Sequence, residues 1–207
     1  PIGIEFTKIA YQPTVVTKKV DDFVHNLVEA VFIVIAVMLA SLGIRTGLLV
    51  SALIPMAILI TFFFMGIFHI GIDQVSLAAL LIVLGMIVDC SIVIAESAMV
   101  QMSQGKSGVQ AAVDSARELG RPLLTSTLII SAAFLPIFLA KSLVGEYTSS
   151  IFKVVTITLL SAWVLAMTIM PLLCSRYLKV QHEKEPYGSV FYRTYRSILI
   201  TLLKHRA

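Results

Sequence analysis

The chain has 207 residues, of which 58% are hydrophobic and only 14% are charged, and its formal net charge is +4. Soluble domains usually carry about 25% charged residues, so too little polar surface remains here to cover a water-soluble globule. The composition predicts an all-α membrane protein, because several runs of about 20 apolar residues have the length of membrane-spanning helices.

The N-terminal segment has a different pattern from the rest of the chain. Residues 2–10 alternate like a short strand, and Pro13 then opens a stretch with apolar residues at helical spacing. A lone strand cannot form a sheet by itself, and neither an initiator methionine nor a signal peptide is recognisable. We therefore expect the chain to be an excerpt of a larger protein.

Five apolar runs follow, each long enough to cross a hydrocarbon core of about 30 Å. They cover residues 23–42, 48–68, 75–100, 122–140 and 151–174. Residues 23–179 are thus expected to form a bundle of five transmembrane helices. Residues 180–207 are expected to hold an amphipathic helix that can lie in the membrane interface, and then the start of a further apolar run.

Lysine and arginine are concentrated in the connections after the first, third and fifth runs. By the positive-inside rule these connections are cytoplasmic, and the N-terminal strand lies outside. The rule accounts for the basic charge without nucleic-acid binding, for which no motif is present.

Two of the cytoplasmic connections carry local structural signals. Gly43 and Gly47 lie in a tight charged turn, where a glycine dimerisation motif does not apply. Ser107 suits a helix N-cap, and Gly120 followed by Arg121 and Pro122 suits a helix end. Whether this helix and the one after Pro186 only connect, or also contact a partner or lipid, stays open.

Asp89 lies near the middle of the third run, where a charge costs about 2.5–3.5 kcal/mol on insertion scales. Intramembrane carboxylates usually pair with a cation or carry protons and ions; the alternative is a structural, hydrogen-bonded aspartate. Gly85, one turn earlier, permits the close approach of another helix. Glu96 and Glu29 lie nearer the ends of their runs and can reach water, which makes them boundary residues or supporting polar groups.

Metal, cofactor and nucleophile signals are weak by comparison. Cys90 and Cys174 are far apart in sequence, which favours two free buried thiols over a disulfide or a metal pair. The four histidines show no ligand spacing, and no phosphate loop, nucleophile elbow or zinc signature occurs. We expect no metal site, no cofactor and no enzyme activity.

Four stretches resemble one membrane-protein family, the resistance–nodulation–division (RND) transporters, and most closely its hydrophobic and amphiphilic efflux branch. They are residues 27–30 (LVEA), 85–96 (GMIVDCSIVIAE), 133–137 (AFLPI) and 170–174 (MPLLC). The resemblance implies that residues 1–22 end a periplasmic porter subdomain and add a lead-in helix. The five runs would be the second to sixth helices of a twelve-helix membrane domain, and residues 180–207 would lead into its second half.

The same resemblance implies a function, the export of drugs or other amphiphilic compounds driven by proton influx. Asp89 matches the first of two adjacent family aspartates and would be the proton relay, while Cys90 occupies the second position. Cys90, Glu96 and Glu29 are possible supporting polar residues. The partner lysine lies on the other half of the transporter. A homotrimer in the bacterial inner membrane, a periplasmic adaptor and an outer-membrane channel are also implied.

Two other interpretations remain at this stage. The heavy-metal branch of the family also uses a single aspartate in this motif, although the runs here lack a methionine or cysteine ladder suited to soft metals. A non-transporting scaffold or protein-translocation accessory of related architecture would use Asp89 structurally, so that its replacement would harm folding rather than flux.

Overall fold

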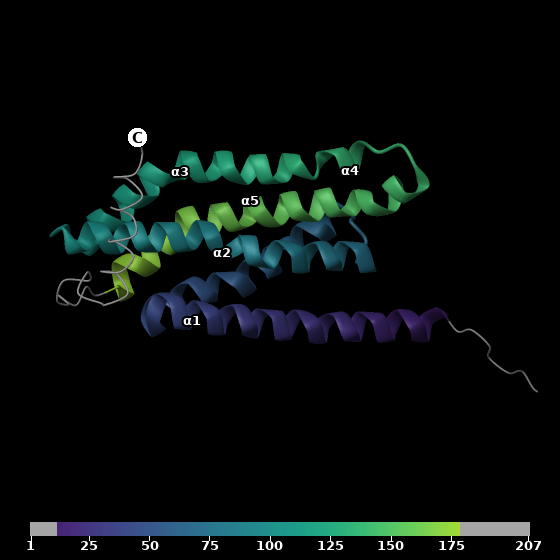
Figure 1. Ribbon diagram of the computed structural model, residues 1–207, viewed down its shortest axis with the longest axis horizontal. Coiled ribbons are helices and arrows are strands. Elements are labelled where there is room, and N and C mark those ends of the chain that lie inside the picture. The colour runs from purple at the N-terminus through teal and green to yellow at the C-terminus, as the bar shows by residue number, and fades with distance from the viewer. Residues whose placement is uncertain (1–11, 179–207) are drawn as a thin grey trace, which may run out of the picture.

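The computed structural model describes residues 12–178, and all regular elements in this range are helices. They are α1 (Gln12–Ile67), α2 (Gln74–Ser103), α3 (Gly108–Ala133), α4 (Leu135–Leu139) and α5 (Leu143–Tyr177), as Figure 1 shows. The all-helical prediction is confirmed for this range. The expected strand at residues 2–10 and the interfacial helix within 180–207 lie outside the described residues.

Helix α1 is a hairpin of two arms, residues 12–42 and 44–67. Gly43 has φ 77° and ψ 164°, a backbone conformation that favours glycine. The two arms run in opposite directions from this residue (Figure 1). At Gly47, an added Cβ would lie 2.8 Å from the carbonyl oxygen of Met38 on the first arm. The expected tight turn is confirmed: the positive φ accounts for Gly43, and the closeness of the two arms accounts for Gly47.

The Gly47→Ala variant is expected to lower the free energy of unfolding by about 1–3 kcal/mol, as overpacking usually does. The reason is that the contacted atoms belong to the backbone of Met38 and Leu39, which cannot rotate away. Denaturant unfolding of the purified protein in mixed micelles measures the change. Gly66→Ala, where an added Cβ meets nothing within 4 Å, is the matched control. Equal stabilities of the two variants would contradict this account of the turn.

Helix α2 is 30 residues long, so it spans about 45 Å at roughly 1.5 Å per residue. A capping box fixes its start: the amide of Ser76 donates to Asp73 Oδ1 at 2.6 Å, and the amide of Asp73 donates to Ser76 Oγ at 2.9 Å. The predicted run 75–100 is confirmed as a helix with nearly these bounds.

Helix α3 differs from the prediction at its middle. Its N-cap is Ser107, as expected, but the expected end at Gly120 is wrong, because the helix continues through Pro122 to Ala133. A proline removes only one backbone donor, and the segment is held against α5, where Trp163 Nε1 donates to the Gly120 carbonyl oxygen at 3.1 Å. The break comes at Phe134, and α4 follows with a proline in its first turn.

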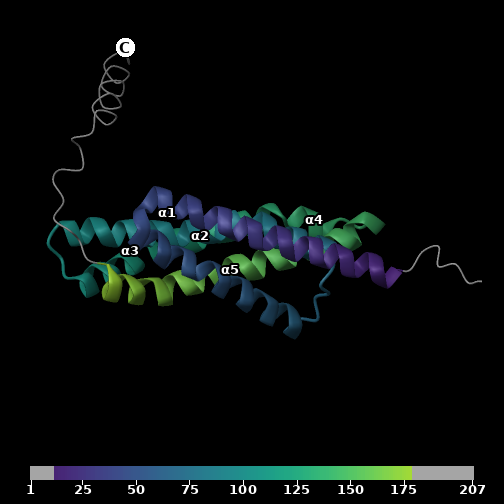
Figure 2. The same ribbon diagram turned by 90° about the horizontal axis from the view of Figure 1, so that it is seen from below.

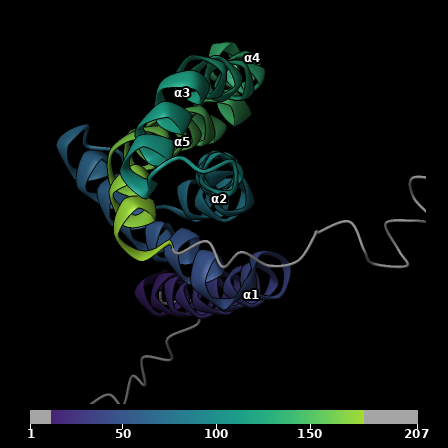
Figure 3. The same ribbon diagram turned by 90° about the vertical axis from the view of Figure 1, so that its left-hand side faces the viewer.

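Helices α2 and α5 form the centre of the bundle, with α3 and α4 on one side and α1 on the other (Figures 1 and 3). The core contains Ile54 from the second arm of α1, Leu84 and Ile94 from α2, and Val154 and Met170 from α5, all essentially without exposed surface. Figure 2 shows the first arm of α1 along the outside of this bundle. The packed core thus holds α2 in place and leaves one of its faces uncovered.

Four segments within the described range are long and apolar enough to cross a membrane. The first, Thr17–Ile67, contains both arms of α1, and the others are Gln74–Ser103, Gly108–Leu139 and Tyr147–Tyr177. The chain is therefore a multi-pass membrane protein. Its connections alternate between two ends of the bundle: the turn at Gly43 and the connection 104–107 lie at one end, and the connections 68–73 and 140–142 lie at the other (Figure 1).

Candidate functional site

One face of α2 is exposed along most of the helix, whereas the remaining faces pack against α1, α3 and α5. The exposed positions recur every three or four residues, which places them in one stripe. We call this set the α2 stripe; it consists of Ile82, Gly85, Asp89, Val93, Glu96 and Val100. A carboxylate in the middle of the uncovered face of an apolar helix needs a partner group, because the bilayer interior solvates a charge poorly.

Asp89 lies halfway along α2 and is exposed. No hydrogen bond or ion pair joins it to another residue in the described part of the chain. The position of Gly85, one turn earlier, is also open, since a Cβ added there meets nothing within 4 Å. The stripe therefore presents a carboxylate next to a space that can accept another helix at close range.

Cys90 faces a different environment from Asp89, although the two residues are adjacent. Its side chain is only 8% exposed, and Sγ lies 3.9 Å from Thr127 Oγ1 on α3. Successive residues of an α-helix are rotated by about 100°, which accounts for the separation. The thiol belongs to the packed interior, and only the carboxylate reaches the uncovered face.

The other two predicted polar residues do not join Asp89. Glu96 is exposed on the same stripe, but seven residues separate the two carboxylates, about 10 Å along the helix axis. Glu29 is exposed on the first arm of α1. Within residues 12–178 no group of three or more histidine, cysteine, aspartate or glutamate side chains is placed to hold a metal ion.

Hydroxyl groups of α3 form hydrogen bonds within the helix and across to α5. Thr125 and Thr127 donate to carbonyl oxygens of their own helix at 3.0 and 2.8 Å. Ser131 instead hydrogen bonds across to Thr156 of α5. Such interhelical hydrogen bonds average about 0.6 kcal/mol in membrane proteins. The Ser131–Thr156 hydrogen bond thus links α3 to α5, which packs against α2.

A family model, described as the AcrB/AcrD/AcrF family, matches residues 1–206. The chain belongs to this family of RND transporters. The AcrB/AcrD/AcrF match covers both the α2 stripe and the helices that support it. The resemblance given by the four sequence stretches is thereby confirmed.

Several curated AcrB/AcrD/AcrF-like relatives align with most of the chain. An uncharacterized transporter of Haemophilus influenzae is 28% identical over 83% of this chain and 17% of its own length. The nickel and cobalt resistance protein CnrA of Cupriavidus metallidurans is 27% identical, with 86% of this chain and 18% of its own length covered. The multidrug resistance protein MdtC of Pectobacterium carotovorum is 29% identical over 82% of this chain and 17% of its own length. The chain thus spans less than a fifth of these relatives.

Proposed function

We propose that the chain is part of a proton-driven efflux pump, a substrate:proton antiporter that exports drugs or other amphiphilic compounds. Asp89 is the residue that binds and releases the coupling proton. No covalent bond of the exported compound is made or broken, and no cofactor is required. The observation that carries the proposal is the carboxylate of Asp89 on the uncovered stripe of an otherwise apolar, packed helix.

Coupling requires Asp89 to alternate between a neutral and a charged form as the bundle rearranges. The neutral form is compatible with an apolar environment, while the ionised form needs a cation or water. A lysine from the other half of the transporter, facing the stripe beside Gly85, would supply that cation. Moving one charge across the membrane yields about 2.3 kcal/mol for each 100 mV of potential, which adds to the pH gradient.

The rest of the assembly follows from the same proposal. Five spans of the chain are the second to sixth helices of a twelve-helix domain. They are the first arm of α1, its second arm, α2, α3 together with α4, and α5. Connections with Arg45 and Lys106 face the cytoplasm of a bacterium, and the domain lies in its inner membrane. The full pump is a homotrimer that works with a periplasmic adaptor and an outer-membrane channel.

Metal efflux is the second candidate function, favoured by the similarity to the nickel and cobalt resistance protein. The MdtC relatives are named for multidrug resistance and align equally well. We place the amphiphilic substrates first because MdtC relatives from several bacteria match the chain. The substrate pocket itself lies in parts of the transporter beyond this segment.

The function is tested by expressing the full-length transporter in a bacterium that lacks its own efflux pumps. We expect higher minimum inhibitory concentrations for cationic dyes and detergents, and unchanged values for nickel and cobalt. Dye efflux should stop when a protonophore collapses the proton gradient. Resistance to the metals without resistance to dyes would overturn the amphiphilic substrate assignment, and efflux that survives the protonophore would overturn the proton coupling.

A further inference from the structure

A polar recess lies at the predicted cytoplasmic end of α2, between that helix and α3. It has a volume of about 420 Å³ and is lined by Ser97, Val100, Gln101, Gln104, Lys106 and Glu118. Five of these six side chains are polar or charged, in a chain whose helices are otherwise mostly apolar. A recess of this size and polarity accommodates several water molecules, since each needs two to four polar partners.

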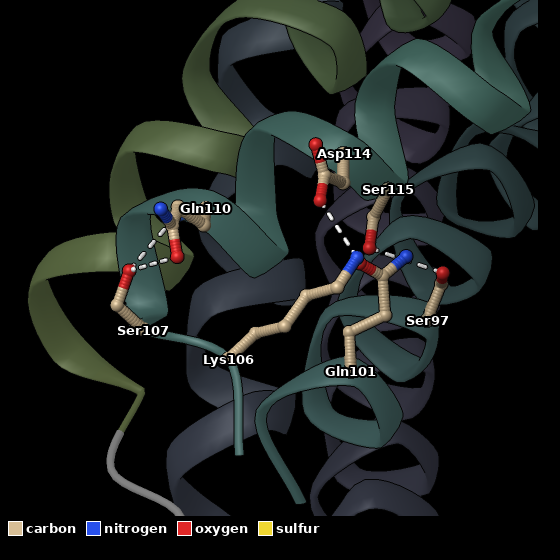
Figure 4. Close-up of polar contacts among 7 residues, drawn as sticks. All are labelled: Ser97, Gln101, Lys106, Ser107, Gln110, Asp114 and Ser115. Carbon is tan, nitrogen blue, oxygen red and sulfur yellow. Dashed lines mark hydrogen bonds and ion pairs between the residues drawn. The ribbon is translucent and has the colours of Figure 1, made fainter. Parts of the chain in front are cut away.

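Hydrogen bonds hold the walls of the recess in place (Figure 4). Ser97 Oγ donates to Ser115 Oγ of α3 at 3.0 Å. Lys106 Nζ donates to Gln101 Oε1 at 2.9 Å and to Asp114 Oδ2 at 2.7 Å. The lysine charge is thus already balanced by Asp114. These contacts connect α2, the following turn and α3, so the recess is a built feature of the fold.

The charges around the recess do not favour a bound anion. Glu118 is exposed and forms no ion pair within residues 12–178, and Glu96 lies next to Ser97. Arg45 and Arg176 are exposed at the same end of the bundle but do not line the recess. A site with a paired lysine, a lining carboxylate at Glu118 and a second carboxylate nearby at Glu96 attracts water and protons rather than a phosphate or a carboxylate ligand.

The recess meets the α2 stripe at its cytoplasmic end. Val100 belongs to both, and it is 54% exposed. Glu96 precedes Ser97, and it lies about 10 Å along the helix from Asp89. The stripe therefore leads from Asp89 past Val93 and Glu96 into the recess, on a single helix and without a packed core residue in between.

We propose that this recess is the water-filled opening through which Asp89 exchanges its proton with the cytoplasm. The inference rests on the proposed function and adds the route of the proton. The protonated carboxyl of Asp89 gives its proton to water beside the stripe, which becomes hydronium, and Asp89 becomes a carboxylate. Water in the recess then passes the proton to the bulk, with the carboxylates of Glu96 and Glu118 favouring the cation along the way.

A cysteine in the recess tests the route in the full-length transporter. Ser97→Cys should react with a membrane-impermeant, positively charged thiol reagent added to the cytoplasmic side of inside-out vesicles. The bulky product should then remove most of the dye efflux of that variant, because it displaces the water. Val100→Cys is a second position on the same wall if Ser97→Cys assembles poorly. The native thiols of Cys90 and Cys174 are buried and give a low background.

Ser126→Cys is the matched control, since Ser126 is exposed on α3 within the predicted membrane span and does not line the recess. It should stay unreactive. An unreactive Ser97→Cys, or a modified one with unchanged efflux, would overturn the route. The result is distinguishable from a failure of the proposed function, because Asp89→Asn would still abolish efflux in the first case and would leave it intact in the second.

Discussion

Replacing Asp89 by asparagine in the full-length transporter is expected to abolish efflux while expression and membrane insertion stay at the wild-type level. Asparagine keeps the shape of the side chain but cannot gain or lose a proton, so the cycle loses its coupling step. Folding of this segment should not suffer, because Asp89 makes no hydrogen bond or ion pair within residues 12–178. Minimum inhibitory concentrations and dye efflux, with protein levels from immunoblots, measure the effect.

The neighbouring Cys90→Ala variant is the control for position on the helix. Cys90 is buried against Thr127 rather than exposed on the stripe. The thiol of Cys90 should therefore carry no charge in the cycle, and the Cys90→Ala variant should retain most of the efflux. If Cys90→Ala were as inactive as Asp89→Asn at equal expression, the thiol would be part of the mechanism. Loss of expression in Asp89→Asn would instead favour a structural aspartate.

Gly85→Leu is the second substitution with a large expected effect. In the proposed transporter another helix lies against the stripe at Gly85, where the chain leaves space. A leucine side chain would hold that helix away from Asp89 and lengthen the distance to the partner cation. Overpacking of this kind usually costs about 1–3 kcal/mol, and we expect efflux to fall well below the wild-type level. Dye efflux at matched expression measures it.

Gly66→Leu provides the matched comparison on the second arm of α1. Gly66 is exposed, and an added Cβ there also meets nothing within 4 Å. In the proposed arrangement this position faces lipid, which accommodates a leucine readily, so efflux should be kept. Equal activity of the Gly85 and Gly66 variants would show that the stripe also faces lipid, and the assignment of a covering helix would then be wrong.

The helices could be predicted from the sequence where apolar runs are bounded by residues with a local capping role. The run 75–100 became α2 because Asp73 and Ser76 cap its start through contacts three residues apart. The prediction was wrong at Gly120, where a contact with Trp163, 43 residues away, lies beside the proline that was expected to end the helix. Local patterns do not contain such tertiary contacts.

At the candidate site, too, local features could be predicted and tertiary contacts could not. The position of Asp89 halfway along α2 could be predicted, because it follows from the bounds of the apolar run. Its exposure could not, since a helix that is apolar on all sides gives no indication of which face its neighbours cover. The burial of Cys90 against Thr127 depends on the packing of two helices whose contacting residues are 37 positions apart. Gln101 in the recess was missed because its role depends on Lys106 and α3.

The turn at Gly43 has a consequence for how the protein is made. A single residue separates the two arms of α1, and Gly47 brings them into backbone contact. The connection is too short for one arm to remain in water after the other arm has entered the bilayer. The arms should therefore leave the ribosome and enter the bilayer as a pair, with Arg45 retained on the side of synthesis. Lengthening this turn by a flexible insertion would uncouple their entry and make the orientation of the first arm depend on its own flanking charges.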